Sequence, residues 1–341
     1  MRYNKTFVRK NLKNFNVFVF IALVALLVIL IAGVFWSVKN PVFKNNKTDS
    51  YQQKNTEQES SFKPTSLDPD IYHIPLSPYL NGLSLVFFAD GYLSWDDFEK
   101  DTDAIARGLK LVEPWKSYDK YNIYKIRPKE LDICVVRTEN ERKPVLRCDT
   151  RKTNEYLNKI TIPQKPFKLI VLSRRDFQSW ANVVRLNDTG IFFSITKPIS
   201  GLTEEQNYAI LFLHLIGHAF GLKDEEKFVI AKAESAVHIP DGPNCAPDKK
   251  TAQKWWGRLA ENNPSVGYFK GCSGSDNYIK PTEYSLMNLG EFSFSDIDYG
   301  PVSEEYLRKI LEYCYSDRNY KKQDDPDFFE RYPEFSSCVG D

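Results

Sequence analysis

Two histidines one helical turn apart constrain this chain more than any other feature. His214 and His218 lie in the apolar run Ile210-Leu-Phe-Leu-His-Leu-Ile-Gly-His-Ala-Phe, which is followed by Gly221 and Asp224. One turn of helix brings both imidazoles to the same face, where two neutral rings can bind one Zn²⁺. If the helix ends at Gly221, the chain can fold back and present Asp224 as a third ligand, which leaves a fourth position open for water or substrate.

The helix that carries these histidines is predicted to begin at the capping box Thr203-Glu-Glu-Gln206 and to run to Phe220. It is apolar nearly all round, so we expect it to be buried at the centre of the domain. A histidine on a buried helix is more often a hydrogen-bonded core residue than a ligand. The ligand spacing of this pair, together with Gly221 and Asp224, nevertheless favours a metal site.

Upstream of this helix, apolar and β-branched runs predict strands that alternate with helices. The alternation favours an α/β fold with a mixed twisted sheet and a central histidine-bearing helix. The predicted strands are 83–88, 121–126, 133–137, 145–148, 167–172 and 190–196, and the predicted helices are 94–114, 154–159 and 203–220. Beyond Asp224 the sequence predicts long irregular stretches.

A second apolar run lies near the N-terminus, where residues 14–38 carry no charge. Residues 17–36 are about as many as a helix needs to cross a bilayer, so we expect one transmembrane helix at 15–38 that anchors the protein in the cell membrane. Residues 1–14 are expected to be cytoplasmic, because basic residues are enriched on that side. A cleaved signal peptide is the alternative, although its apolar region would be shorter, at about 7–15 residues.

The composition changes again after the apolar run. Residues 39–78 are polar with few large apolar side chains, which predicts a flexible linker, and the folded domain is then expected at 79–341, outside the cytoplasm. All six cysteines lie in that domain, and an even number in an exported domain predicts disulfides. Of the fifteen connectivities, proximity in sequence favours Cys134–Cys148, Cys245–Cys272 and Cys314–Cys338. Free cysteines in a cytosolic domain are the alternative.

The motif resembles the metzincin pattern H-E-x-x-H-x-x-G-x-x-(H or D) in its Asp-ended form. Met287, in Ser285-Leu-Met-Asn288, resembles the Met-turn that forms an apolar floor under the zinc of metzincins. The alternative is an ordinary core methionine. Further short segments are similar to those of the IgA-peptidase family of zinc metallopeptidases: Leu83–Tyr92, Glu113-Pro-Trp115, Gly242-Pro-Asn-Cys245, Lys254-Trp-Trp256 and Lys280-Pro-Thr282.

The resemblance implies a metzincin-like domain that binds Zn²⁺ through His214, His218 and Asp224 and acts on peptides. One position departs from the pattern: Leu215 stands where the family has the glutamate that accepts a proton from the attacking water. A leucine cannot accept a proton, and a positioned general base is worth about 10²–10⁴-fold in rate.

Nearby carboxylates offer no evident replacement for the glutamate. Glu204 and Glu205 lie roughly 14–15 Å back along the helix. Glu225 and Glu226 reach the site only if their loop turns inward.

Two classes of function follow. The first is a membrane-anchored metallopeptidase-like pseudoenzyme that binds a peptide or protein; the second is an active zinc metalloendopeptidase with a non-standard base. Tyr284, with Tyr278 and Tyr299 as alternatives, is the candidate for oxyanion stabilisation, because metzincins use a tyrosine near the Met-turn. His73 and His238 are spare histidines. The net charge of +1 argues against a nucleic-acid partner, and the sequence does not indicate an oligomeric state.

Overall fold

Strands and helices alternate along the first half of the domain, as the apolar runs predict. The computed structural model describes residues 70–137, 144–162, 167–177, 179–181, 190–195, 203–225, 241–288 and 297–340, all within one unit, residues 64–341. The strands are β1 (Ile71–His73), β2 (Leu83–Asp90), β3 (Tyr121–Arg127), β4 (Cys134–Arg137), β5 (Val145–Cys148), β6 (Lys168–Ser173), β7 (Trp180–Ala181), β8 (Gly190–Ser194), β9 (Phe269–Cys272) and β10 (Ser275–Lys280). The helices are α2 (Trp95–Gly108), α3 (Thr150–Leu157), α4 (Glu204–Ala219), α5 (Lys249–Asn262), α6 (Pro301–Cys314) and α7 (Pro326–Arg331), with short 3₁₀ turns η1 (Leu109–Leu111), η4 (Lys322–Asp324) and η5 (Pro333–Cys338).

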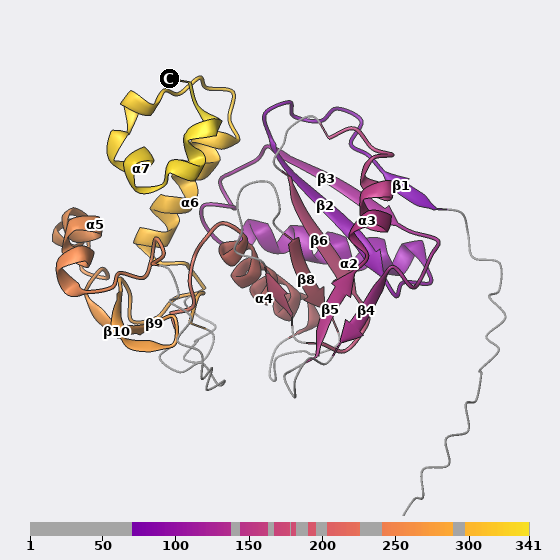
Figure 1. Ribbon diagram of the computed structural model, residues 1–341, viewed down its shortest axis with the longest axis horizontal. Helices are drawn as coiled ribbons and strands as arrows, with labels where there is room; N and C mark the ends of the chain where they lie inside the picture. The colour runs from indigo at the N-terminus through magenta and orange to yellow at the C-terminus, as the bar shows by residue number, and fades with distance from the viewer. Residues whose placement is uncertain are drawn as a thin grey trace, which may run out of the picture. The chain divides into compact units, whose positions relative to one another are not determined.

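The main sheet has six strands in the order β1-β3-β2-β6-β8-β7 (Figure 1). Its four central strands run parallel, and the edge strands β1 and β7 run antiparallel to their neighbours. Central parallel strands are covered on both faces, which explains why all eight residues of β2 are buried. The predicted α/β fold with a mixed sheet is confirmed.

The two faces of the sheet contribute to separate cores. Alternate residues of β2, such as Leu85 and Phe87, pack in the larger core with α2 and α4, whereas Val86 and Phe88 pack against α3 and the β4–β5 hairpin. Helices α2 and α4 approach closely at Gly108, where a Cβ atom would lie only 2.6 Å from the Cβ of Ala209. The histidine-bearing helix is therefore buried between the sheet and the rest of the domain.

The cysteines pair as proximity in sequence predicts. Cys134–Cys148 joins β4 to β5, Cys245–Cys272 joins a loop to β9, and Cys314–Cys338 joins α6 to η5. Each disulfide closes a loop of 14 to 27 residues, so each restrains a local part of the unfolded chain.

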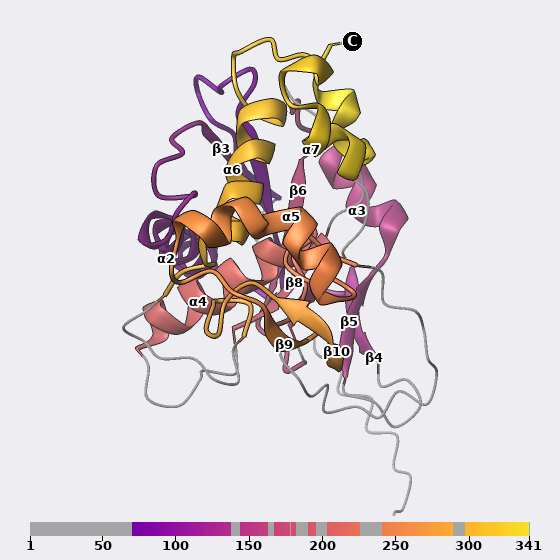
Figure 2. The ribbon, with the colours of Figure 1, turned by 90° about the vertical axis from the view of Figure 1, so that its left-hand side faces the viewer.

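Three helices occupy the region beyond Asp224, where the sequence predicts long irregular stretches. Helix α5 is capped by Asp248, whose side chain accepts from the backbone of Thr251, and it packs against α6 and β10 over a small core of its own (Figure 2). Helix α6 begins at Pro301, and its apolar positions face the larger core. A proline at the first helical position and the 3.6-residue spacing are readable signals, so this prediction was incomplete.

One element of the predicted fold class is wrong. No helix in the residues that the structure describes is long and apolar enough to cross a membrane. The longest, α4, has 16 residues and spans about 24 Å, less than the roughly 30 Å of a bilayer core. The segments predicted to be cytoplasmic and membrane-spanning, 1–14 and 15–38, lie outside the described residues, and β1 lies within the predicted linker 39–78.

Candidate metal centre

Helix α4 has defined caps at both ends, which place its histidines. At the start, Thr203 and Gln206 form the predicted capping box. At the end, Gly221 has φ +98°, a left-handed conformation that favours glycine. The N–H groups of Leu222 and Gly221 donate to the carbonyls of Gly217 and His218 at 3.0 and 2.9 Å, the two bonds of a Schellman motif. The chain therefore reverses direction at Gly221, as predicted, and returns past the helix face that carries the histidines.

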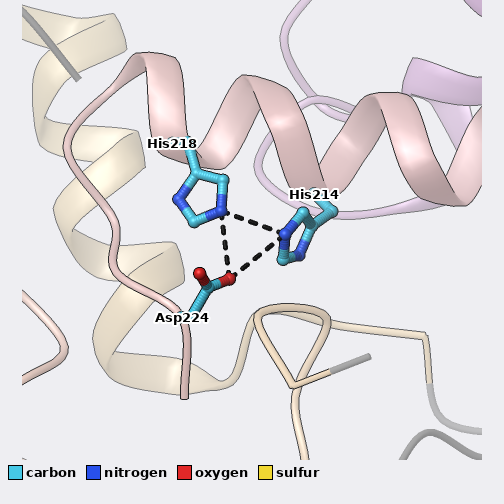
Figure 3. Close-up of side chains that lie close together, drawn as sticks. All are labelled: His214, His218 and Asp224. Carbon is cyan, nitrogen blue, oxygen red and sulfur yellow. Dashed lines mark hydrogen bonds and ion pairs between the residues drawn. The ribbon is translucent and has the colours of Figure 1, made fainter. Parts of the chain in front are cut away.

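Three potential ligand atoms converge beneath this helix (Figure 3). The Nε2 atoms of His214 and His218 are 3.0 Å apart, and the Oδ1 atom of Asp224 lies 3.3 Å from the first and 3.1 Å from the second. In a tetrahedral zinc site with bonds near 2.0–2.1 Å, ligand atoms are about 3.3 Å apart. The observed spacings therefore fit the three protein ligands of such a site.

The opposite nitrogen of each ring determines which tautomer is present. Nδ1 of His214 lies 3.0 Å from the carbonyl oxygen of Leu286, and Nδ1 of His218 lies 2.9 Å from that of Leu222. A carbonyl oxygen only accepts, so each Nδ1 carries the proton and each neutral ring has its lone pair on Nε2. Backbone carbonyls commonly orient metal-binding histidines in this way. Two lone pairs and a carboxylate oxygen then face one another, an arrangement that is stable only with a proton or a cation between them.

The electrostatics of the three residues favour a positive charge at the centre, whether a proton or a metal ion. Burial alone would raise the pKa of Asp224, but the two adjacent imidazoles outweigh it and hold the pKa well below its usual range, so the carboxylate is ionised. Burial alone would lower the pKa of His218, but its hydrogen bond and charge interaction with Asp224 outweigh burial and raise it. The two histidine side chains are 9% and 13% exposed and Asp224 is 46% exposed, so the centre opens to solvent on the carboxylate side.

Met287 is fully buried directly beneath the helix. A Cβ atom at Gly217, between the two histidines, would lie 2.8 Å from Met287 Sδ and 3.0 Å from Cε1 of Tyr299. The segment around Met287 also hydrogen-bonds both the helix and the loop that form the centre. The carbonyl of Leu286 accepts from His214, and the carbonyl of Met287 accepts from the N–H of Glu225, next to Asp224, at 2.8 Å. Met287 is therefore a buried residue packed against the histidine-bearing helix, and its role as an apolar floor under a metal stays a prediction.

Replacing Gly217 with alanine is expected to lower the free energy of unfolding by up to about 2 kcal/mol. The added methyl would overlap Met287 and Tyr299, which costs about 1–3 kcal/mol, and the gain in helix propensity is only about 1 kcal/mol. Gly257 in α5 is the matched control, because there a Cβ atom meets only Tyr268 Oη, at 3.5 Å. Gly257→Ala should keep or slightly raise the melting temperature. Equal melting temperatures for both variants would contradict the close packing.

The position of the missing base is buried. Leu215 is 3% exposed and packs in the larger core. Its hydrocarbon side chain offers the centre no proton acceptor. Tyr299 is also fully buried: its hydroxyl donates to the carbonyl of Leu213 and accepts from Trp115 Nε1, which removes it as an oxyanion-stabilising candidate. Tyr284 is 57% exposed, and no hydrogen bond links it to the three ligands within the described residues.

Glu225 turns inward, but it does not replace the base. Its Oε1 accepts from Asn244 Nδ2 at 2.9 Å, and its Oε2 accepts from the hydroxyls of Ser285 at 2.8 Å and Thr282 at 3.2 Å. Both oxygens are therefore occupied, and the residue is fully buried. The sequence allows Glu225 to turn inward, but no local signal identifies its three partners, which lie 19 to 60 residues away.

The remaining candidates fall outside the centre. His73 lies exposed on β1, at the edge of the sheet opposite the edge that contacts α4. Glu204 and Glu205 occupy the first turn of α4, as expected. Tyr278 lies on β10 and interacts with Asp241. Two predicted candidates, His238 and Glu226, lie outside the described residues.

Comparisons with known proteins do not assign the chain to a family. No family model matches it, and no curated protein matches it. The resemblance to the IgA-peptidase family therefore stays a prediction that rests on the motifs.

Proposed function

We propose that this chain is a zinc-binding, metzincin-type metallopeptidase-like protein that binds peptides or proteins without efficient hydrolysis. The observation that carries the proposal is the convergence of two histidine Nε2 atoms and one carboxylate oxygen within 3.3 Å, with both Nδ1 protons donated to backbone carbonyls. A proton shared among the three side chains is the competing explanation of this geometry.

The residues present support binding better than catalysis. His214, His218 and Asp224 would hold the zinc, which when bound supplies a Lewis acid that polarises a carbonyl oxygen. The carbonyls of Leu222 and Leu286 keep both imidazoles in the ligating tautomer. A hydrolase also needs a group that takes a proton from the attacking water and delivers it to the leaving amine. The leucine at 215 cannot do this, and Glu225 is occupied by its hydrogen-bond donors.

The disulfides support a location in an oxidising compartment. Three disulfides join all six cysteines, and such bonds persist mainly outside the reducing cytosol. We therefore include an extracytoplasmic location in the proposal.

Zinc content tests the proposal directly. Purified wild-type protein is expected to contain about one zinc per chain, because the three side chains proposed as ligands are of the types that bind zinc and lie within 3.3 Å of one another. His214→Ala should bind zinc more than about 100-fold more weakly, since even the partners of ligands are worth 10–100-fold. The matched control is His73→Ala, which removes an exposed histidine far from the centre and should leave zinc binding unchanged. Elemental analysis and competition with a chromogenic chelator measure both quantities.

Two outcomes would overturn parts of this proposal. Wild-type protein that takes up no zinc from a stoichiometric supply would assign the three side chains to a proton-sharing network. Wild-type protein that cleaves casein, and loses this activity in His214→Ala, would identify an active peptidase with another base.

A further inference from the structure

A cleft of about 790 Å³ lies among α5, α6 and α7, the C-terminal helices drawn in orange and yellow in Figures 1 and 2. None of the three candidate metal ligands lines it. Its walls include several aromatic side chains: Trp255, Trp256, Tyr306, Phe328 and Tyr332. A volume in the range of about 300–1,000 Å³, aromatic walls and a few polar groups are typical of ligand sites.

Arg331 gives this cleft a specific chemistry. The central carbon of its guanidinium lies over two aromatic rings, 3.5 Å from the ring centre of Trp255 and 4.8 Å from that of Tyr332. Nη2 donates to the carbonyl of Pro243 at 3.3 Å, and the side chain forms no ion pair among the residues that the structure describes. Asp241 acts on Arg331 only through its charge. A guanidinium stays charged, so a half-buried one with no carboxylate within ion-pair distance among the described residues can gain from a bound anion.

The other charged residues that line the cleft are either paired with an opposite charge or exposed to water. Lys309 is neutralised by Asp325 at 2.7 Å and Glu305 at 3.6 Å. The remaining charged residues that line the cleft are exposed to solvent and need no partner: Lys254, Arg258, Asp327 and Glu330. Among the lining residues, Arg331 is therefore the cation that is both shielded from water and unpaired with a carboxylate.

We propose that this cleft binds the C-terminal carboxylate of a peptide, with Arg331 as the carboxylate-binding fork and the aromatic walls as the pocket for the last side chain. A planar guanidinium held by stacking pairs with a carboxylate through two parallel N–H bonds. We infer a carboxylate ligand from the charge and position of Arg331. That this carboxylate belongs to a peptide rests on the proposed function. Pro243, which accepts from Arg331, precedes Asn244, whose side chain bonds Lys223 and Glu225 on either side of Asp224. The cleft and the metal centre therefore share one loop.

A matched pair of peptides tests this proposal on the intact protein. The probes are fluorescein-Gly-Gly-Ala-Phe with a free carboxylate and the same peptide with a C-terminal amide, measured by fluorescence anisotropy. The free acid is expected to bind about tenfold or more tightly than the amide, because the amide cannot form the charged pair. In Arg331→Gln this preference should disappear. Arg318→Gln, an exposed arginine outside the cleft, should keep it.

The zinc site must be separated from the cleft, because a carboxylate also binds zinc. The preference for the free acid is therefore expected to survive in His214→Ala, and Arg331→Gln is expected to keep the zinc content of wild type. Wild-type protein that binds the acid and the amide equally, or that binds neither, would overturn the proposal without relying on any variant's folding. A preference for the free acid that persists in Arg331→Gln but is lost in His214→Ala would show that the peptide carboxylate binds at the metal centre and not in the cleft.

Discussion

Replacing Leu215 with glutamate is expected to raise peptide hydrolysis by about 10²–10⁴-fold, the usual contribution of a positioned general base. Helical geometry places residue 215 about 60° round the helix from His218, on the adjoining face. The structure supplies the other features that the proposed centre needs: three potential ligand atoms within 3.3 Å of one another and a side open to solvent at Asp224. Cleavage of fluorescent casein by zinc-loaded protein measures the effect.

Leu215→Glu is also expected to destabilise the fold, so its control variant must lose a similar amount of stability. Leu215 is 3% exposed in the larger core, so a glutamate there should lower the free energy of unfolding by about 2–5 kcal/mol. Leu215→Gln has nearly the same size and polarity but cannot act as a base, so it should share the loss of stability and stay inactive. If the folded, zinc-loaded glutamate variant is no more active than the glutamine variant, the missing base is not what prevents hydrolysis.

Removing the Glu225 side chain should have the largest effect on stability. Glu225→Ala would leave the polar groups of Asn244, Thr282 and Ser285 buried without their partner, at a cost of about 3–5 kcal/mol. Glu225→Gln keeps the size and most of the hydrogen bonds, because the two hydroxyls can reorient. Chemical denaturation near pH 6, with excess zinc and then with chelator, compares the two variants. An alanine variant as stable as the glutamine variant would exclude this structural role.

The ionisation of Glu225 predicts a pH dependence that the glutamine variant lacks. Burial raises the pKa of Glu225 from 4.5 to about 7, although hydrogen bonds from Asn244 and Ser285 oppose the shift. The folded state then binds the proton more tightly than the unfolded state. The stability contributed by this proton is fully present below about pH 4.5 and is lost as the pH rises through 7, by about 3 kcal/mol. The wild-type minus Glu225→Gln difference, measured with chelator, should show this decline, and a flat difference would contradict the raised pKa.

Features that depend on neighbours along the chain can be read from the sequence alone. The capping box at Thr203, the one-turn spacing of His214 and His218 and the left-handed glycine at 221 are all local rules, and each is present in the structure. The alternation of strands and helices predicted the mixed sheet, and the nearest cysteines in sequence are the ones that pair. Interactions over a few residues need no knowledge of the rest of the fold, so the sequence contains them in readable form.

Contacts that join distant segments become visible once the chain is folded. The carbonyl of Leu286, 72 residues from His214, determines the tautomer of that ring. Whether Glu225 is a solvated charge or a buried anchor depends on Asn244, Thr282 and Ser285. The hydrogen bond from Tyr299 to helix α4 and the contact of Arg331 with Trp255 also join residues that are far apart in the sequence. Burial and hydrogen-bond partners depend on how whole elements pack, and a single sequence carries no local pattern for them.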